Sequence, residues 1–275
     1  MSAEKMTTRS EPVQGYRQVA ATVAMEGDTA RIDAKDVYYR QLNEAIRAAF
    51  EAGAKTVVLE NVNGQRYIGT GISGKDRRIE IHGTPGNDLA TFMDGPTIEV
   101  MGNAQDGVGN TMNAGTVVIH GDAGDVLGYG MRGGKVFIKG DVGYRVGIHM
   151  KAYENLVPIM VCGGKARDFF GEYMAGGLLI LLGMFTQFPE QPLVGGFLGT
   201  GMHGGAIFVR GQVEEWQTGK EVGVFEADAE DMGRLTPILA EYCDALGLSL
   251  DDVLAEPFTK LVPVSHRPYG KLYAY

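Results

Sequence analysis

Short stretches in the middle of the chain alternate between apolar and other residues with a period of two, which is typical of β-strands. Ile79 and Ile81 flank Glu80, and Ile119 follows Val118 at the same phase. Such a stretch recurs about every 19 residues, without a helical pattern in between. The pattern predicts one short strand per repeat, with inward-facing apolar pairs at Ile79/Ile81, Ile98/Val100, Val117/Ile119, Val136/Ile138, Leu179/Leu181 and Ile207/Val209.

Methionine and glycine mark the same repeat. Steps of 19 residues from Gly74 reach Met93, Met112, Met131 and Met150, and longer units of 24 and 28 residues reach Met174 and Met202. Three positions before each start stands a small residue: Gly71, Ala90, Gly109, Gly128, Gly147, Gly171 or Gly199. Glycine on both sides of a strand supplies tight corners. We therefore predict an all-β solenoid, a parallel β-helix of about seven turns stacked about 4.8 Å apart.

The N-terminal flank carries a helical pattern instead. Apolar residues from Tyr38 to Phe50 recur every four positions. Asp33 and Asp36 are expected to open this helix, and Gly53 is expected to close it.

The C-terminal flank is also predicted to be helical. Apolar residues from Met232 to Leu246 have helical spacing, with Pro237 inside the segment, and Ser249 is expected to cap a second short helix. Terminal helices would cover the open ends of the solenoid. The predicted divisions are an extension over 1–30, an N-terminal helix in 31–56, the β-helix over 57–212, and a helical cap and tail over 213–275.

Composition narrows the function classes. Glycine makes up 41 of 275 residues, and 35 of these glycines lie between Gly64 and Gly223. A net charge of −9 argues against nucleic-acid binding, which needs a basic face. The longest apolar run, 176–185, is shorter than the roughly 20 residues of a membrane span. Two cysteines without a C-x-x-C pair, and a start without an apolar signal core, predict a cytoplasmic protein.

The glycine motifs and titratable residues predict no reactive site. Gly69–Gly74 matches G-x-G-x-x-G, but a strand pattern follows it, whereas a dinucleotide site needs a helix there. His82 and His120 face outward two turns apart, about 9.6 Å, which is too far to share a metal ion. Glu80 and Glu99 are expected to form a solvated ladder. We assign no catalytic, cofactor-binding or metal-ligating residue to this chain.

The outward-facing strand positions change from charged to apolar residues along the solenoid. They are charged at Glu80 and Glu99 and become apolar from Val118 onward. An apolar stripe of this kind is usually covered, here by a terminal helix of the chain or by a partner subunit or second copy. The long segment 184–198 is expected to take part in assembly. The candidate interface residues are Phe137, Ile180, Leu182, Phe208, Met184, Phe185 and Phe188.

The repeat resembles the G-x-G-x-G repeat domain at the C-terminal end of the glutamate synthase large subunit. The similarity is carried by segment 61–69 (NVNGQRYIG), by the units in 112–151, and by segment 171–177 (GEYMAGG), which resembles the glutamate synthase version. The same repeat occurs in one of the subunits of formylmethanofuran dehydrogenase and of the related formyltransferase/hydrolase complex. The resemblance implies a right-handed β-helix with a mainly structural role.

In that family the glutaminase nucleophile, the FMN site and the iron–sulfur ligands lie in other domains. The resemblance therefore implies a non-catalytic subunit of a glutamate-synthase-type oxidoreductase, without a cofactor of its own. Its expected partners are an FMN-binding synthase subunit and a glutaminase-type amidotransferase subunit, and FMN and an iron–sulfur cluster are expected in these partners. Assembly into a homo-oligomer is a further possibility. The alternatives are the repeat-bearing subunit of a formyl-transferring complex, an N-methylglutamate synthase subunit, and a free-standing enzyme or sugar binder.

Overall fold

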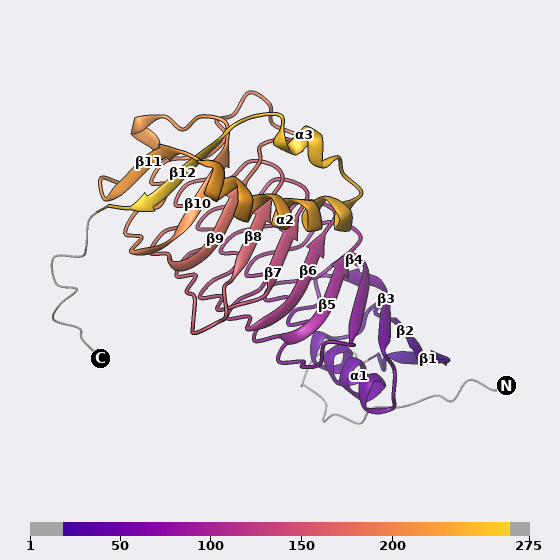
Figure 1. Cartoon of the computed structure of the whole chain (residues 1–275). Coiled ribbons are helices and arrows are strands. Elements are labelled where there is room, and N and C mark those ends of the chain that lie inside the picture. The colour runs from indigo at the N-terminus through magenta and orange to yellow at the C-terminus, as the bar shows by residue number, and fades with distance from the viewer. Residues whose placement is uncertain (1–18, 265–275) are drawn as a thin grey trace.

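The computed structural model describes residues 19–264. In this part the chain coils into an all-β parallel solenoid of about six turns, close to the seven that the repeat predicts. Figure 1 shows the strands side by side along one stack, with α1 (Tyr39–Glu51) at the N-terminal end and α2 (Ala229–Leu246) lying across the sheet.

The strands of the described residues form one sheet in the order β1-β2-β3-β4-β5-β6-β7-β8-β9-β10-β12-β11. Strands β2 to β10 pair in parallel, and the pairs β1–β2, β10–β12 and β11–β12 are antiparallel. The strands are β1 (Thr22–Glu26), β2 (Thr29–Asp33), β3 (Thr56–Asn63), β4 (Arg78–Thr84), β5 (Asp94–Val100), β6 (Ala114–Ile119), β7 (Lys135–Ile138), β8 (Ile159–Cys162), β9 (Ala175–Leu181), β10 (Gly204–Arg210), β11 (Val222–Glu226) and β12 (Phe258–Pro263). Two short helices, η1 (Glu215–Gln217) and α3 (Leu250–Leu254), complete the described elements.

The predicted inward positions form the core. Ile98 lies in register with Ile79 on one side and Val117 on the other, and all three are fully buried. Ile119 is buried as predicted, while the next residue, His120, faces outward. The methionines that start the repeats are also buried and fill the interior at one corner. Burial of each large aliphatic side chain stabilises the fold by about 1.5–3 kcal/mol.

One corner of each turn is built from left-handed backbone at every second residue. Gly107, Gly109 and Thr111 follow this alternation, with φ of 72°, 71° and 52°. The middle residue of each corner faces the interior, where a Cβ on Gly128 would lie 2.7 Å from Met160 Cε. Glycine therefore recurs there because little room is left beneath the next turns, and the one exception, Ala90, carries a single methyl group.

A second corner is held by a ladder of aspartates. Asp122 Oδ1 accepts a hydrogen bond from the Asp141 N–H at 2.8 Å, and Asp141 Oδ1 accepts one from the Lys165 N–H at 2.7 Å. A Cβ on Gly140 would overlap the Asp122 carboxylate. Each aspartate thus joins its turn to the next, and the glycine before the following aspartate leaves the room for it.

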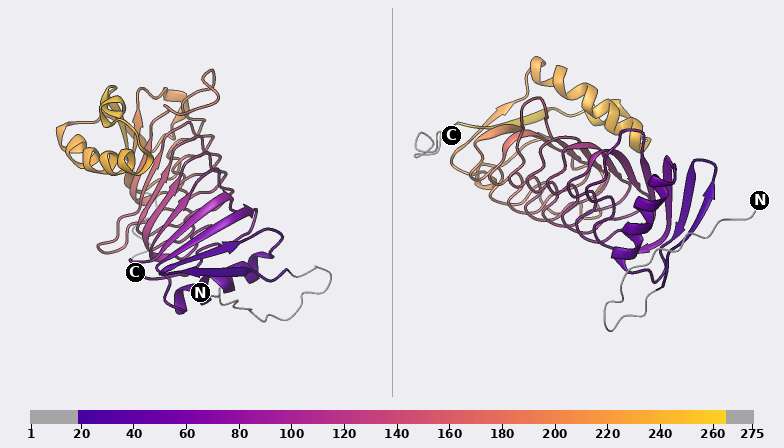
Figure 2. Two further views of the ribbon diagram at one scale, coloured as in Figure 1. Left: turned by 90° about the vertical axis from the view of Figure 1, so that its right-hand side faces the viewer. Right: turned by 90° about the horizontal axis from the view of Figure 1, so that it is seen from below.

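The N-terminal flank differs from the sequence prediction. The helix begins at Tyr39, and Asp33 instead ends β2. Strands β1 and β2 form a hairpin where an extension was expected, because Ala30 and Ile32 alternate into the core and β2 pairs with β3. The apolar face of α1, including Ile46, packs on the same core. Figure 2 shows α1 at this end of the stack.

The C-terminal flank holds the predicted helices and two strands that were not predicted. Helix α2 continues through Pro237, and the Ser249 side chain caps α3 by accepting a hydrogen bond from the Asp252 N–H at 3.2 Å. Strands β12 and β11 extend the sheet beyond β10. Helix α2 lies along the outer face of the sheet, not over its open end (Figures 1 and 2).

Helix α2 covers the apolar outward column. One buried cluster unites the sheet residues Val118, Phe137, Val161, Ile180, Leu182 and Phe208 with the α2 residues Leu235, Leu239, Tyr242, Cys243 and Leu246. Of the two covers that the sequence predicted, the chain's own helix is the one that the structure contains.

Tyr242 anchors the middle of this contact. Its ring meets Phe137 edge-on, with 5.7 Å between the ring centroids, and its Oη donates a hydrogen bond to the Ile138 carbonyl at 3.2 Å. A Cβ on Gly163 would overlap the Tyr242 hydroxyl, so this glycine admits the side chain. Tyr242 is fully buried.

An ion pair fixes the start of α2 to the sheet. The buried Asp231 carboxylate lies 2.8 Å from Lys260 Nζ of β12 and also caps the helix together with Asp228. Burial alone would raise the pKa of Asp231, but the hydrogen bonds from Lys260 and from the Asp228 N–H hold that pKa below its usual value. The carboxylate therefore stays charged and bound at neutral pH.

The phase of the solenoid is testable with one replacement at two neighbouring positions. Ile119→Asn buries an unpaired amide and should cost several kcal/mol of stability or prevent folding. His120 lies on the outward side, so His120→Asn loses the contact to Glu99 and should cost less than about 1 kcal/mol. Thermal or urea unfolding of both variants measures the difference, and equal losses would contradict this assignment of inward and outward positions.

The anchoring role of Tyr242 predicts a large effect of its removal. Tyr242→Ala should cost about 3–5 kcal/mol, because it leaves a cavity against Phe137. The exposed Tyr153→Ala is the matched control and should change stability by less than about 0.5 kcal/mol. Urea unfolding compares the two, and similar losses would show that α2 does not depend on this contact.

Candidate functional site

The seven candidate interface residues lie in two different environments. Phe137, Ile180, Leu182 and Phe208 are at most 1% exposed beneath α2. They are consequently not available to a partner at the surface of this chain, because the helix occupies the face on which they lie. Met184 is half-buried against that cluster, Phe185 next to it is also half-buried, and Phe188 is 47% exposed.

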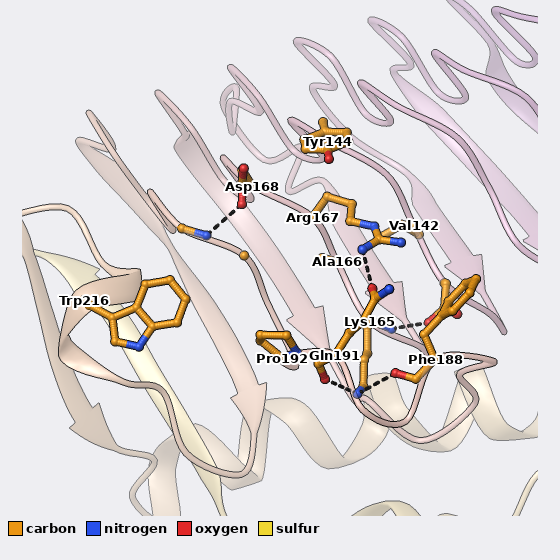
Figure 3. Close-up of a pocket in the computed structure, with 13 residues that line it drawn as sticks. Val142, Tyr144, Lys165, Ala166, Arg167, Asp168, Phe188, Gln191, Pro192 and Trp216 are labelled. Carbon is orange, nitrogen blue, oxygen red and sulfur yellow. Dashed lines mark hydrogen bonds between the residues drawn. The ribbon is translucent and has the colours of Figure 1, made fainter.

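Phe188 borders a cleft of about 230 Å³ at the aspartate corner of the solenoid. Figure 3 shows Trp216 on one side of this cleft and Arg167 with Phe188 on the other. Successive turns supply its floor, and the long segment after β9 and η1 supply its rims. The lining residues are Asp141, Val142, Tyr144, Lys165, Ala166, Arg167, Asp168, Phe188, Gln191, Pro192, Gly195, Gly196 and Trp216.

Lys165 holds the rim that carries Phe188. Its Nζ donates hydrogen bonds to the carbonyl oxygens of Phe188 at 2.9 Å and Pro189 at 2.8 Å, and to that of Gln191. Charge-assisted hydrogen bonds are about twice as strong as neutral ones. The ammonium group therefore fixes the backbone of the segment 188–191, and the exposed Phe188 side chain projects from this ordered loop.

The aspartate ladder fixes the beginning of the same loop. Asp141 Oδ2 accepts hydrogen bonds from the Thr186 hydroxyl at 3.0 Å and the Gln187 N–H at 3.2 Å. The Gln187 side-chain amide reaches Asp122 Oδ2 at 3.1 Å. One oxygen of each aspartate thus joins two turns, and the other oxygen binds the loop.

Arg167 is a cation on the Phe188 side of the cleft. Its guanidinium donates a hydrogen bond to Gln191 Oε1 and lies 5.7 Å from the centroid of the Phe188 ring. Within residues 19–264, no carboxylate forms an ion pair with it. Arg145 on the neighbouring corner differs, since it pairs with the buried Glu172.

Trp216 stands on the opposite rim, at 65% exposure. It belongs to η1, where Glu214 and Gln217 form a reciprocal capping box. The buried Gln217 side chain also donates a hydrogen bond to the Val194 carbonyl. The turn that carries Trp216 is therefore tied to the solenoid, although the indole itself faces solvent.

Stacked side chains continue from the cleft along the left-handed corner. Phe169 and Phe197 stack with 4.8 Å between ring centroids, and the Arg145 guanidinium lies 4.5 Å from the Phe169 centroid. All three have positive φ, and Phe197 is 56% exposed. Tyr144, the residue before Arg145, belongs to the cleft and is 47% exposed.

Two histidines outside the cleft are engaged in local pairs with glutamates. His82 Nε2 lies 2.7 Å from Glu80 Oε1, and His120 Nε2 lies 2.8 Å from Glu99 Oε1. Across residues 19–264, no three His, Cys, Asp or Glu side chains gather closely enough to hold a metal ion. Burial raises the pKa of the Cys162 thiol, which faces the solenoid interior.

The sequence analysis named the loop and Phe188, which border this cleft, and did not name Arg167 or Trp216, which also line it. The two residues lie 49 positions apart in the chain and belong to different elements. One usable signal was present, since Trp216 is the single tryptophan and follows the long insertions. Lys165 binds main-chain carbonyl oxygens, which every residue type carries, so the amino-acid sequence does not indicate these contacts.

Stacked turns with left-handed glycine corners define a specific class of parallel β-solenoid. The chain belongs to the GXGXG motif family, whose model matches residues 41–264. It is 50% identical over 248 residues to protein MJ1350 of Methanocaldococcus jannaschii, described as uncharacterized, with 88% of this chain and 95% of that protein covered.

A solved structure shares the fold. One chain of the formyltransferase/hydrolase complex from Methylorubrum extorquens, determined in complex with methylofuran, superposes with a TM-score of 0.57. The match covers 78% of this chain and 80% of that chain, at 21% sequence identity. Among the helices of the described residues, none has the length and hydropathy that crossing a bilayer requires.

The role of Lys165 in ordering the cleft gives a testable prediction. Lys165→Met removes the ammonium that binds three loop carbonyls, so the amides of Gln187 and Gln191 should exchange hydrogen about tenfold to a hundredfold faster. Lys75→Met, at an exposed position between β3 and β4, is the control. Hydrogen-exchange mass spectrometry measures both, and unchanged exchange in the loop would contradict this role.

Proposed function

We propose that this chain is a non-catalytic β-helix subunit of a multi-subunit glutamate-synthase-type oxidoreductase. Such a complex moves ammonia from glutamine to 2-oxoglutarate at a flavin. The chain would serve as a rigid scaffold for an FMN-binding synthase subunit and a glutaminase-type amidotransferase subunit. FMN and an iron–sulfur cluster would reside in the partners, and the complex would work in the cytoplasm.

The observation that carries this proposal is the surface that the fold leaves exposed. The apolar sheet face is covered by α2, whereas Trp216, Phe188 and Tyr144 stand exposed on ordered supports at one corner. Exposed aromatic residues on a rigid scaffold are typical of protein contacts. Membership of the GXGXG motif family and the resemblance of segment 171–177 to the glutamate synthase version support the choice of complex.

The alternative is the repeat-bearing subunit of a formylmethanofuran dehydrogenase or formyltransferase/hydrolase complex. The observation in its favour is the shared fold with a chain of the Methylorubrum extorquens complex. At 21% identity this likeness concerns the fold. A subunit of an N-methylglutamate synthase is the second alternative, because the resemblance of the repeat does not distinguish the amino-acid product.

Co-expression tests the proposal directly. The tagged chain is produced with the FMN-binding synthase and amidotransferase subunits encoded in the same genome. We expect a stable complex with visible flavin absorbance, while the chain purified alone is colourless. Formyltransferase subunits serve as the control partners. Assembly with those subunits instead of the synthase subunits, or a flavin bound to the isolated chain, would overturn the proposal.

A further inference from the structure

We propose that the edge strand β11 pairs with β11 of a second copy of this chain, antiparallel and in the register that places the two Val224 residues opposite each other. The sheet then continues from one copy into the other around a twofold axis at Val224. Such self-association does not depend on the identity of any other subunit, and it therefore goes beyond the proposed function.

Strand β11 is an edge of the sheet. Within residues 19–264 its strand neighbour is β12, and Figure 1 places it at the opposite end of the sheet from β1. The Ala227 N–H donates a hydrogen bond to the Phe258 carbonyl at 2.9 Å, so residue 227 directs its main chain toward β12. This direction alternates along an antiparallel strand. Val224 and Glu226 therefore direct their N–H and C=O groups toward the free edge.

The side chains of β11 are uncovered as well. Val224 is 43% exposed and Phe225 is 52% exposed, and the strand contains neither proline nor lysine. Proteins usually protect an edge strand with such residues, with a bulge or with a covering segment, since an unprotected edge pairs with other strands. The opposite edge, β1, exposes Thr22 and Glu26 and buries Val23. We therefore expect β11 to be the edge that associates.

The strand is complementary to itself about its central residue. Antiparallel pairing about Val224 aligns the whole of β11, Val222–Glu226, with its copy. Each Val224 N–H then donates to the Val224 carbonyl of the second copy, and each Glu226 N–H donates to the Val222 carbonyl. The Val222 N–H takes no part, because it binds the Gly219 carbonyl within its own chain. A shift of this register shortens the paired length.

The apolar side chains fit the same register. Pairing about Val224 places Phe225 opposite Gly223 of the second copy. An aromatic ring opposite a strand glycine covers the surface that the glycine leaves bare. In the single chain the Phe225 ring already leans over Gly223, where a Cβ would lie 2.7 Å from Phe225 Cε2. Two such rings over two glycines would remove apolar surface of both copies from water.

Charges at the two ends of the strand favour a second copy as the occupant. Lys220 lies four positions before Val224 and Asp228 lies four positions after it, and both are exposed. The twofold axis therefore brings each Lys220 toward Asp228 of the other copy. These opposite charges offset part of the repulsion between two chains that each carry a net charge of −9.

Sedimentation velocity of the full chain measures the association. A contact of one short strand is small, so we expect a monomer–dimer equilibrium with a dissociation constant of about 10–100 µM. Val224→Pro removes the N–H at the twofold axis, and it spares the bonds to β12 because this N–H points to the free edge. It should weaken the dimer at least about tenfold. Val224→Thr keeps the N–H and should dimerise like the wild-type chain.

A charge reversal tests the ends of the strand. Lys220→Glu should weaken the dimer about threefold to tenfold, because it faces Asp228 of the second copy with a like charge. Lys75→Glu makes the same change of net charge at an exposed position between β3 and β4, and it should leave the dissociation constant unchanged. Equal effects of the two variants would show that net charge alone governs association.

A cysteine at the axis tests the register directly. Opposed residues in a hydrogen-bonded antiparallel pair have Cα atoms about 5.5 Å apart, which a disulfide can span. Val224→Cys should therefore form a covalent dimer under mild oxidation by copper phenanthroline. Val157→Cys, at a position that is 46% exposed elsewhere, is the control and should remain monomeric. The native Cys162 and Cys243 are buried and do not compete.

The outcomes decide the inference even where one variant fails to fold. A wild-type chain that stays monomeric at about 500 µM overturns it, since that concentration exceeds the expected dissociation constant. A dimer that a folded Val224→Pro chain retains in full would place the contact elsewhere. If Val224→Pro does not melt within a few degrees of the wild-type chain, the disulfide test decides: no covalent Val224→Cys dimer means that β11 does not pair with itself.

Discussion

Each turn of the solenoid lies directly on the previous one, and this close stacking decides where side chains can exist. At the left-handed corner a Cβ on Gly128 would lie 2.7 Å from Met160 Cε, and at the aspartate corner a Cβ on Gly140 would overlap Asp122. Glycine therefore recurs at positions that a neighbouring turn covers. Core side chains occupy the space beside glycine at one corner, and carboxylates occupy it at the other. The same close stacking therefore explains both the recurrence of glycine and the contacts that hold the turns together.

The aspartate ladder shows how this constraint reaches the candidate site. Asp141 uses one oxygen to join its turn to the next and the other to bind the loop that carries Phe188. Lys165, whose N–H takes part in that ladder, holds the same loop through its ammonium group. The residues that join successive turns thus also hold the Phe188 rim of the cleft, so this rim is fixed to the solenoid.

The sequence predicted the elements that repeat and missed those that occur once. Period-two alternation placed Ile119 inward and His120 outward, because every turn repeats the same environment. The β1–β2 hairpin and the antiparallel β11 and β12 occur outside the repeat. No second copy of these elements exists in the sequence, so a comparison of repeats could not predict their pairing. The cleft was missed for a different reason: Arg167 and Trp216 line one cleft because of loop geometry and of main-chain carbonyls that bind Lys165, and residue spacing does not encode either.

Mutual stacking offsets part of the backbone strain at the corner positions of Phe169 and Phe197. Phe169 and Phe197 have φ of 66° and 61°, a conformation that costs about 1–2 kcal/mol for a residue with a Cβ. Aromatic stacking returns about 0.5–1.5 kcal/mol, and the Arg145 guanidinium over Phe169 adds about 0.5–1 kcal/mol. The strain falls on both phenylalanines and amounts to about 2–4 kcal/mol together, so the two aromatic contacts offset only part of it. In an earlier turn the equivalent position is Gly107, which avoids the strain altogether. Bulky residues at these corners therefore add little stability to the isolated chain, and what they provide is a fixed apolar surface beside the cleft.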